Sequence, residues 1–228
     1  MKQERPQIMF VKPNSYWFMI DLETLGTLPG CKIMTIGVNV FNRTDACVDT
    51  FYIRVERENQ YGLKEDDETI LWWESQSAEA KNEMFHPDNR HDLKSALLYL
   101  TDFIRMYSNV DEKGRSDAVV LGNGSDFDNA FLQVAYKACK LKQPWEFWNN
   151  RCYRTYKSMA PHIKISREGV HHNALDDAIT QTKHLLEVIK YLESRHGPGI
   201  ENRTEDSVGF FIKTWNTIRE VGSRWLAR

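Results

Sequence analysis

The order of apolar patterns along the chain constrains the fold more than any other feature. Short strand-like segments come first, and amphipathic helical segments then alternate with strands. Residues 16–20, 32–41 and 47–55 are apolar or partly alternating, and the turn residues 42–45 predict a hairpin between the last two. Further along, the patterns predict a short helix near 69–73, a buried strand over 118–121 and helices over 92–107, 128–139 and 174–192. This order predicts a mixed α/β domain.

Composition and chain breaks set the expected boundaries of that domain. The 228 residues, 41% hydrophobic and 27% charged, suit one soluble domain with decorations and exclude a disordered, collagen-like or coiled-coil chain. We expect a lead-in over 1–15, a domain over 16–195 and, beyond the break at 197–199, a C-terminal helical extension over 196–228. The extension is expected to dock on the domain or to mediate self-association as a homodimer. No long apolar run and only four scattered cysteines predict a cytoplasmic protein without a membrane segment.

The strongest chemical signal is the pair Asp21 and Glu23, which follows the apolar segment 16–20. Side chains two residues apart on an extended segment point the same way, so both carboxylates can converge on one point. Acid-x-acid spacing is weak evidence by itself, and a solvated strand end is the alternative. Position distinguishes this pair, because strand ends in α/β folds carry functional groups.

Two further acidic sites stand at comparable positions. Residues 122–128, Gly-Asn-Gly-Ser-Asp-Phe-Asp, follow the second buried strand, and residues 171–177, His-His-Asn-Ala-Leu-Asp-Asp, open the long helix. A surface histidine at a helix start is the plain alternative for His172. Clustered carboxylates repel one another unless cations lie between them, and oxygen ligands without cysteine favour Mg²⁺ or Mn²⁺ over zinc. Carboxylates from separate elements plus a histidine suit two-metal phosphodiester hydrolysis.

These three sites together resemble the motifs of the DEDDh superfamily of 3′→5′ exonucleases. The matching residues are Asp21-x-Glu23-Thr24, Asn123 with Phe127-Asp128 and Phe131-Leu132, and His172-Asn173-Ala174 with Asp177-Ala178. The resemblance implies a ribonuclease H-like fold with a central five-stranded mixed β-sheet flanked by helices. It also implies two Mg²⁺ or Mn²⁺ ions held by Asp21, Glu23, Asp128 and Asp177, with His172 as the general base.

Other segments resemble phage exonuclease A and the related bacterial exoribonucleases. They are Thr69–Trp73 with Gln76-Ser77, and Phe147-Trp148-Asn149 before Arg151 and Arg154-Thr155. The doubled residues allow a second frame, His171 with Asp176, at the same spacing. The family pattern favours His172 with Asp177.

A basic and aromatic stretch adds a candidate nucleic-acid surface. Residues 137–167 hold eight Lys or Arg and one acid, with five interleaved Trp, Phe or Tyr residues, a combination that suits single strands; a basic loop over buried aromatics is the alternative. We expect one of Trp72 and Trp73 to pack inside and the other to border the cleft. Arg151 and Arg154 suit phosphate, with surface salt bridges as the alternative. The full set of candidate nucleic-acid contacts is Thr24, Leu25, Trp72, Trp73, Asn123, Phe127, Arg151 and Arg154.

The sequence therefore predicts a metal-dependent 3′→5′ exonuclease that degrades single-stranded ends, with DNA favoured, to nucleoside 5′-monophosphates. Two alternatives stay open. One is an exoribonuclease of the same superfamily, because the contact that would recognise a 2′-hydroxyl is not visible in the sequence. The other is a binding module that kept the fold without turnover.

Overall fold

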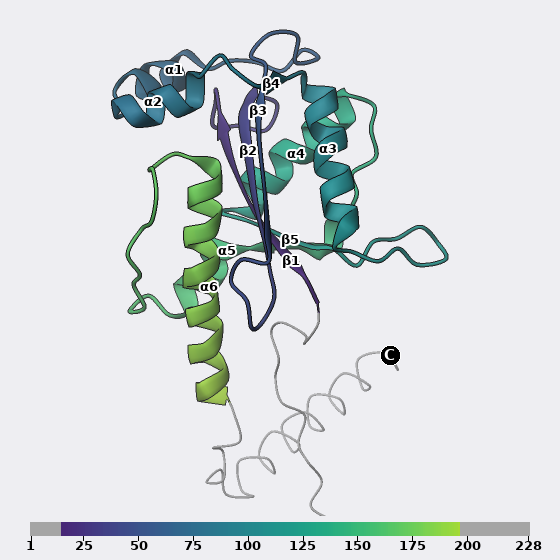
Figure 1. The fold of residues 1–228 in the computed structure, drawn as a ribbon, viewed down its shortest axis with the longest axis vertical. Helices are drawn as coiled ribbons and strands as arrows, with labels where there is room; N and C mark the ends of the chain where they lie inside the picture. Colours follow the sequence, from purple (N-terminus) through teal and green to yellow (C-terminus); the bar gives the residue numbers. More distant parts are fainter. Residues whose placement is uncertain (1–14, 197–228) are drawn as a thin grey trace, which may run out of the picture. The chain divides into compact units, whose positions relative to one another are not determined.

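The computed structural model describes residues 15–196 (Figure 1). Of these, residues 15–191 belong to one compact unit, and the end of the last helix, residues 192–196, belongs to a second unit. The predicted lead-in and C-terminal extension lie outside the described residues, so the proposed domain limits remain predictions. Among residues 15–196, no helix has both the length and the apolar character needed to cross a bilayer.

The described residues form a mixed sheet of six strands in the order β4-β3-β2-β1-β5-β6. The strands are β1 (Trp17–Thr24), β2 (Ile33–Phe41), β3 (Asp49–Val55), β4 (Arg90–His91), β5 (Val119–Gly122) and β6 (Asn150–Cys152). β1, β2 and β3 pair antiparallel, which confirms the predicted hairpin, whereas β5 runs parallel to β1. β4 and β6 pair parallel at the two edges. The sheet thus has one strand more than the five expected.

Helices cover both faces of this sheet. They are α1 (Asp67–Glu74), α2 (Ala78–Phe85), α3 (Leu93–Met106), α4 (Ala130–Ala138), α5 (Tyr153–Met159) and α6 (Ala174–His196), with the short turns η1 (Ser125–Asn129) and η2 (Phe147–Asn149). Figure 1 shows α3 and α4 on one side of the sheet and α6 on the other. The main core lies on the side of the sheet that α3 and α4 cover. There Phe18, Ile20 and Leu22 of β1 are buried among the apolar residues of these two helices.

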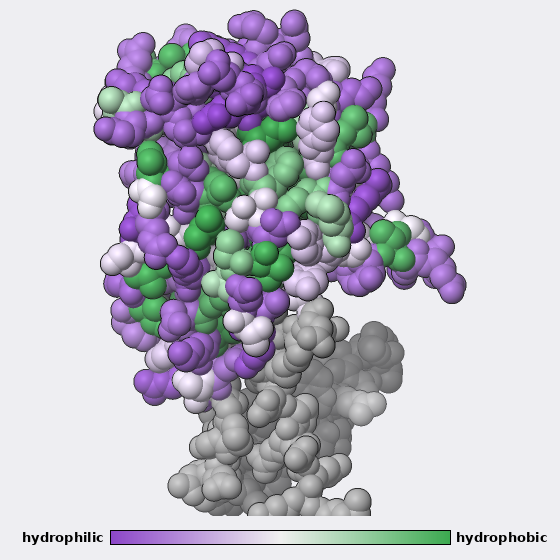
Figure 2. Space-filling model, in the orientation of Figure 1, coloured by the Kyte–Doolittle hydropathy of each residue, from purple (hydrophilic) through white to green (hydrophobic). Residues whose placement is uncertain are grey.

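α1 and α2 bury only two residues each, Thr69 and Trp73 of α1 and Ala80 and Met84 of α2. In Figure 2 the surface over these helices is largely hydrophilic. Trp73, Ala80 and Met84 form a small second core together with Leu25 and Met34. This second core fixes α1 beside the end of β1.

Candidate active site

Asp21 and Glu23 lie within β1 and not after it, because the strand continues to Thr24. The alternation of β1 places Leu22 in the main core and turns both carboxylates to the opposite face, toward α6. Both residues are buried, at 8% and 7% exposure. The predicted convergence of these two carboxylates on one face is therefore present.

Asp128 approaches the same point from the neighbouring strand. It lies in η1, a π-helical turn that follows β5, and its Oδ1 accepts a hydrogen bond of 3.2 Å from the backbone N–H of Leu22. A side chain at Gly122 would place its Cβ 2.8 Å from Asp128 Oδ2, so the end of β5 needs glycine there. The turn thereby brings Asp128 against the backbone between Asp21 and Glu23.

α6 supplies Asp177 and Gln181, one turn apart. Gln181 Nε2 donates a 2.6 Å hydrogen bond to Oδ1 of Asp21, and both α6 residues are buried. The helix can approach this closely because residue 37 of β2, the partner of Asp21 in the ladder, is glycine. Four acidic side chains from three segments that are distant in sequence therefore meet on one face of the sheet.

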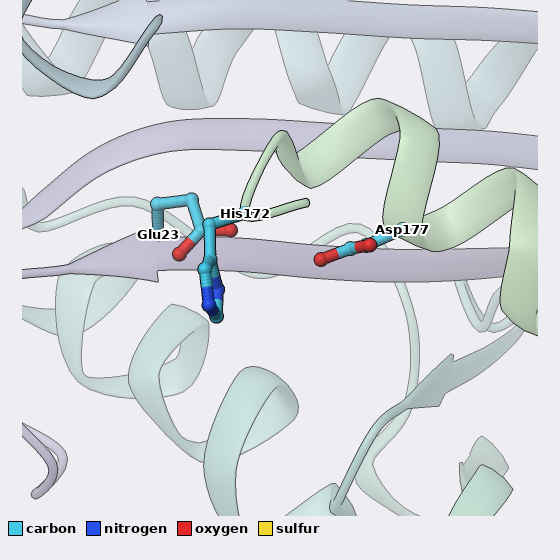
Figure 3. Close-up of side chains that lie close together, drawn as sticks. All are labelled: Glu23, His172 and Asp177. Atoms are coloured by element: carbon cyan, nitrogen blue, oxygen red, sulfur yellow. The ribbon is translucent and has the colours of Figure 1, made fainter. Parts of the chain in front are cut away.

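His172 stands just before α6, in the left-handed backbone region with φ 63°. Its ring and the carboxylates of Glu23 and Asp177 offer nitrogen and oxygen atoms that all lie within 4.8 Å of one another. Figure 3 shows Asp177 pointing from α6 toward Glu23 and His172. Asn173 caps α6 by accepting hydrogen bonds from the N–H groups of residues 175 and 176.

The adjacent residues Asp176 and Asp177 have different surroundings in the structure. Asp176 Oδ2 accepts a 2.7 Å hydrogen bond from the N–H of Val170, and Asp176 lies close enough to Gly169 that a Cβ there would overlap its carboxyl group. Asp176 thus holds the loop before α6, while Asp177 faces the acidic cluster. Both His171 and His172 border the cavity, with their rings stacked.

Burial and mutual repulsion raise the pKa values of the acidic cluster. Burial is the main cause for Asp21 and Glu23, and the neighbouring carboxylates raise both pKa values further. Burial raises the pKa of Asp128 to about 7, and burial raises that of Asp177 even though Arg167 opposes the shift. Burial, His171 and Arg167 lower the pKa of His172 to about 4, so its imidazole is neutral at pH 7.

These residues fit divalent cations. Among buried side chains in the described part of the chain, Asp128 Oδ2 is one of the few oxygens without a hydrogen-bond partner. A buried oxygen without a hydrogen-bond partner costs free energy. The raised pKa values of the four carboxyl groups show that the nearby positive charge does not balance their negative charge, which a bound cation would do. Carboxylate oxygens without cysteine are a donor set for Mg²⁺ or Mn²⁺.

A cavity of about 580 Å³ opens on the cluster. Of the predicted nucleic-acid contacts, its lining includes Thr24, Trp72, Trp73, Asn123, Phe127 and Arg154. Trp73 is buried and its indole N–H donates to Thr24 O at 3.0 Å, whereas Trp72 is 44% exposed with its ring edge-on to that of His172. This matches the expectation that one tryptophan packs inside.

Two predicted contacts lie outside that lining. Leu25 is buried in the small second core, and the Arg151 guanidinium donates to the backbone oxygens of Trp148 and Asn150. Their role in binding nucleic acid remains a prediction. Phe147 and Trp148 are exposed neighbours, whereas Trp145 is buried, so the basic and aromatic stretch divides between surface and core.

Three residues at the site were missed by the sequence reasoning, namely Gly37, Arg167 and Gln181. Gln181 follows Asp177 by four residues and so shares its helix face, a signal that could have identified it. In the sequence Arg167 is one cation of the basic stretch, whereas in the structure its guanidinium forms an ion pair with Asp177. Nothing in the sequence around Gly37 marks it as the contact point of α6.

Comparison with known proteins gives concordant results. A family model described as 3′-5′ exoribonuclease Rv2179c-like domain matches residues 17–189. A protein of Enterobacteria phage T4 named exodeoxyribonuclease is 26% identical over 159 residues, which cover 60% of this chain and 69% of that protein.

Two solved structures have a similar fold. The nuclease domain of 3′hExo, a DEDDh family member, bound to rAMP, has a TM-score of 0.51 and 17% identity, covering 80% of this chain and 94% of that one. Cell-death related nuclease 4 has a TM-score of 0.52 and 10% identity, covering 78% of this chain and 64% of that one. The predicted fold class is confirmed.

Proposed function

Because the chain belongs to the 3′-5′ exoribonuclease Rv2179c-like family, and thereby to the DEDDh superfamily of 3′→5′ exonucleases, we propose that its acidic cluster hydrolyses single-stranded 3′ ends to nucleoside 5′-monophosphates. The chain is an exonuclease, and the alternative of a binding module without turnover falls with that assignment. The observation that carries the proposal is the meeting of Asp21, Glu23, Asp128 and Asp177 beside one neutral histidine.

The four carboxylates would hold two Mg²⁺ or Mn²⁺ ions. Such ions, when bound, stabilise the attacking and leaving oxygens of an in-line displacement at phosphorus. His172 takes the proton of the attacking water through whichever ring nitrogen carries no hydrogen, because at neutral pH its low pKa keeps the ring neutral, with one nitrogen free to accept a proton. Gln181 donates a hydrogen bond to Oδ1 of Asp21, and the other carboxylate oxygen of Asp21 stays available to bind an ion.

The cavity lining suits a terminal nucleotide. Trp72 presents a half-exposed indole at the rim, which can stack on a base, and Arg154 places a guanidinium where a phosphate would enter. Phe127 adds an apolar contact beside Asp128. These contacts would bind the base and the phosphate backbone of the nucleic acid, and so position the scissile bond next to the carboxylates.

The comparisons support two substrates. Single-stranded DNA, the preference expected from the sequence, is supported by the likeness to the phage protein named exodeoxyribonuclease. RNA is supported by the description of the family itself. One digestion that contains matched DNA and RNA oligonucleotides with different labels separates the two, because the preferred substrate is consumed first.

The central test replaces single carboxylates. Asp21→Ala and Asp128→Ala are each expected to abolish release of nucleoside monophosphate from a labelled oligonucleotide with Mg²⁺, while far-UV circular dichroism shows a retained fold. Asp126→Ala is the matched control, because Asp126 is an exposed carboxylate two residues from Asp128. Full activity of the Asp21 or Asp128 variant would refute the assignment.

A further inference from the structure

Arg167 lies on the loop that joins α5 to α6 and forms an ion pair with Asp177 inside the candidate site. The Asp177 side chain is 8% exposed, whereas that of Arg167 is 44% exposed. The guanidinium thus reaches in from solvent and covers a buried carboxylate. Its charge opposes the burial that raises the pKa values of Glu23 and Asp177.

The place that Arg167 takes is one that a divalent cation would need. Asp177 contributes to the group of ligand atoms that lie within 4.8 Å of one another, together with Glu23 and His172. A guanidinium and a divalent ion at the same buried carboxylate would repel each other strongly, because little water screens them there. Arg167 and an ion are therefore rivals for Asp177.

The loop around Arg167 is tied down on both sides. The His184 ring lies 3.0 Å from the backbone oxygen of Ile163, Lys183 pairs with Glu168, and Asp176 accepts the N–H of Val170. These contacts hold the loop backbone against α6 independently of the Arg167 ion pair. The long Arg167 side chain can leave Asp177 while the loop stays in place, and it stays at the cavity whose lining it joins.

A guanidinium released into this cavity is well suited to bind the phosphate of a nucleotide. Its planar fork of N–H groups matches the oxygens of a phosphate and binds them with charge-assisted hydrogen bonds. The other arginine of the lining is Arg154, and its positive charge favours the ionised form of Asp128 and so lowers the pKa of that residue. Arg167 stands instead on the Asp177 side of the cavity, where no other Lys or Arg of the described chain lines it.

We propose that Arg167 serves two anions in turn. It neutralises Asp177 in the metal-free protein, and it transfers to the phosphate of the nucleotide once Asp177 binds a divalent cation. The proposal rests on the proposed function, and it adds a substrate contact whose release is coupled to metal binding. A purely structural Arg167, which merely fastens the loop to α6, is the competing explanation.

The experiment measures two affinities of the whole chain by isothermal titration calorimetry, without turnover. The first is for Mn²⁺ alone, and the second is for thymidine 5′-monophosphate, a product, at saturating Mn²⁺. For Arg167→Gln we expect Mn²⁺ to bind about three- to tenfold more tightly, because the rival cation is gone, and the nucleotide to bind about tenfold more weakly. Arg167→Lys, which keeps the charge but not the fork, is expected to fall between Arg167→Gln and the wild type.

Lys183→Gln is the matched control, because it removes a cation that ties the same loop to α6 outside the cavity. It should change neither affinity. Mn²⁺ affinity that is unchanged or weaker in Arg167→Gln would overturn the proposal, as would an unchanged nucleotide affinity. Failure of the wild-type protein to bind Mn²⁺ at all would instead count against the proposed function, so the two failures are distinguishable.

Discussion

Gly37 of β2 lies under the first turn of α6, and a Cβ on Gly37 would come within 2.3 Å of the backbone carbon of Ala174. Gly37 is also the ladder partner of Asp21. The absence of one side chain thus lets the helix that carries Asp177 approach the strand that carries Asp21. The distance between these two parts of the site depends on it.

Replacing Gly37 by alanine should push α6 away from the sheet. We expect a loss of about 1–3 kcal/mol in the free energy of unfolding, as for other overpacked positions, and at least a tenfold loss of exonuclease activity. Urea denaturation and a labelled-oligonucleotide assay measure the two effects. Adding Ala174→Gly should not restore activity, because the blocking atoms are backbone; restoration would contradict this explanation.

Replacing Gln181 by methionine should weaken the site without unfolding the protein. The side chain keeps its length but no longer donates to Asp21 Oδ1, so Asp21 loses the bond that orients it. We expect about a tenfold loss in Mn²⁺ affinity or kcat, typical of the groups that orient metal ligands. Gln181→Glu should be worse, because it adds a negative charge to the cluster. Wild-type activity in both variants would show that Asp21 needs no such support.

Replacing Asp128 by asparagine should stabilise the metal-free protein at neutral pH. The folded pKa of Asp128 is raised to about 7 from 3.8, so the folded state holds a proton that the unfolded state has released, and stability falls as pH rises through this window. The asparagine variant does not lose stability in this way. At pH 8 its free energy of unfolding should exceed that of the wild type by on the order of 2–4 kcal/mol. Urea denaturation in EDTA at pH 5 and pH 8 measures it. Equal pH dependence of the two proteins would contradict the raised pKa.

Replacing His172 by asparagine should lower kcat and change the pH profile. Asparagine tolerates the left-handed backbone of this position, so the effect reports on the imidazole, whose contribution as general base is about 10²–10⁴-fold. Nucleotide binding should change little. His171→Asn is the control, and a larger kcat loss in that variant would exchange the roles of the two histidines.

Replacing Trp72 should affect mainly the binding of nucleic acid, whereas replacing Trp73 should affect mainly the stability of the fold. Trp72→Ala removes a half-exposed ring at the cavity rim and should weaken oligonucleotide binding by about 1–3 kcal/mol without a large stability change. Trp73→Ala empties a buried site and should cost about 3–5 kcal/mol in the free energy of unfolding. Anisotropy titration and thermal melts measure the two effects. A stability loss confined to Trp72→Ala would reverse the assignment.

Long elements with clear periodicity could be predicted from the sequence, because burial of one face leaves a repeat of apolar residues. α3 and α6 are such elements. α2 was missed because it buries only Ala80 and Met84, too few residues to leave a clear apolar repeat. β4 and β6 were missed because two or three residues carry no pattern of their own, and it is pairing with β3 and β5 that makes them strands.

The acidic residues and His172 could be read from the sequence alone, because each site is local: a strand that alternates, a glycine-rich strand end and a capped helix start. The local patterns were therefore enough to select these side chains as the candidates for the chemistry. Only the tertiary structure decided how they are held, since Gln181 reaches Asp21 across 160 residues of chain. The same holds for Arg167 at Asp177 and for α6 on Gly37, because these contacts follow from how closely helix, loop and sheet pack, a quantity that no local pattern encodes.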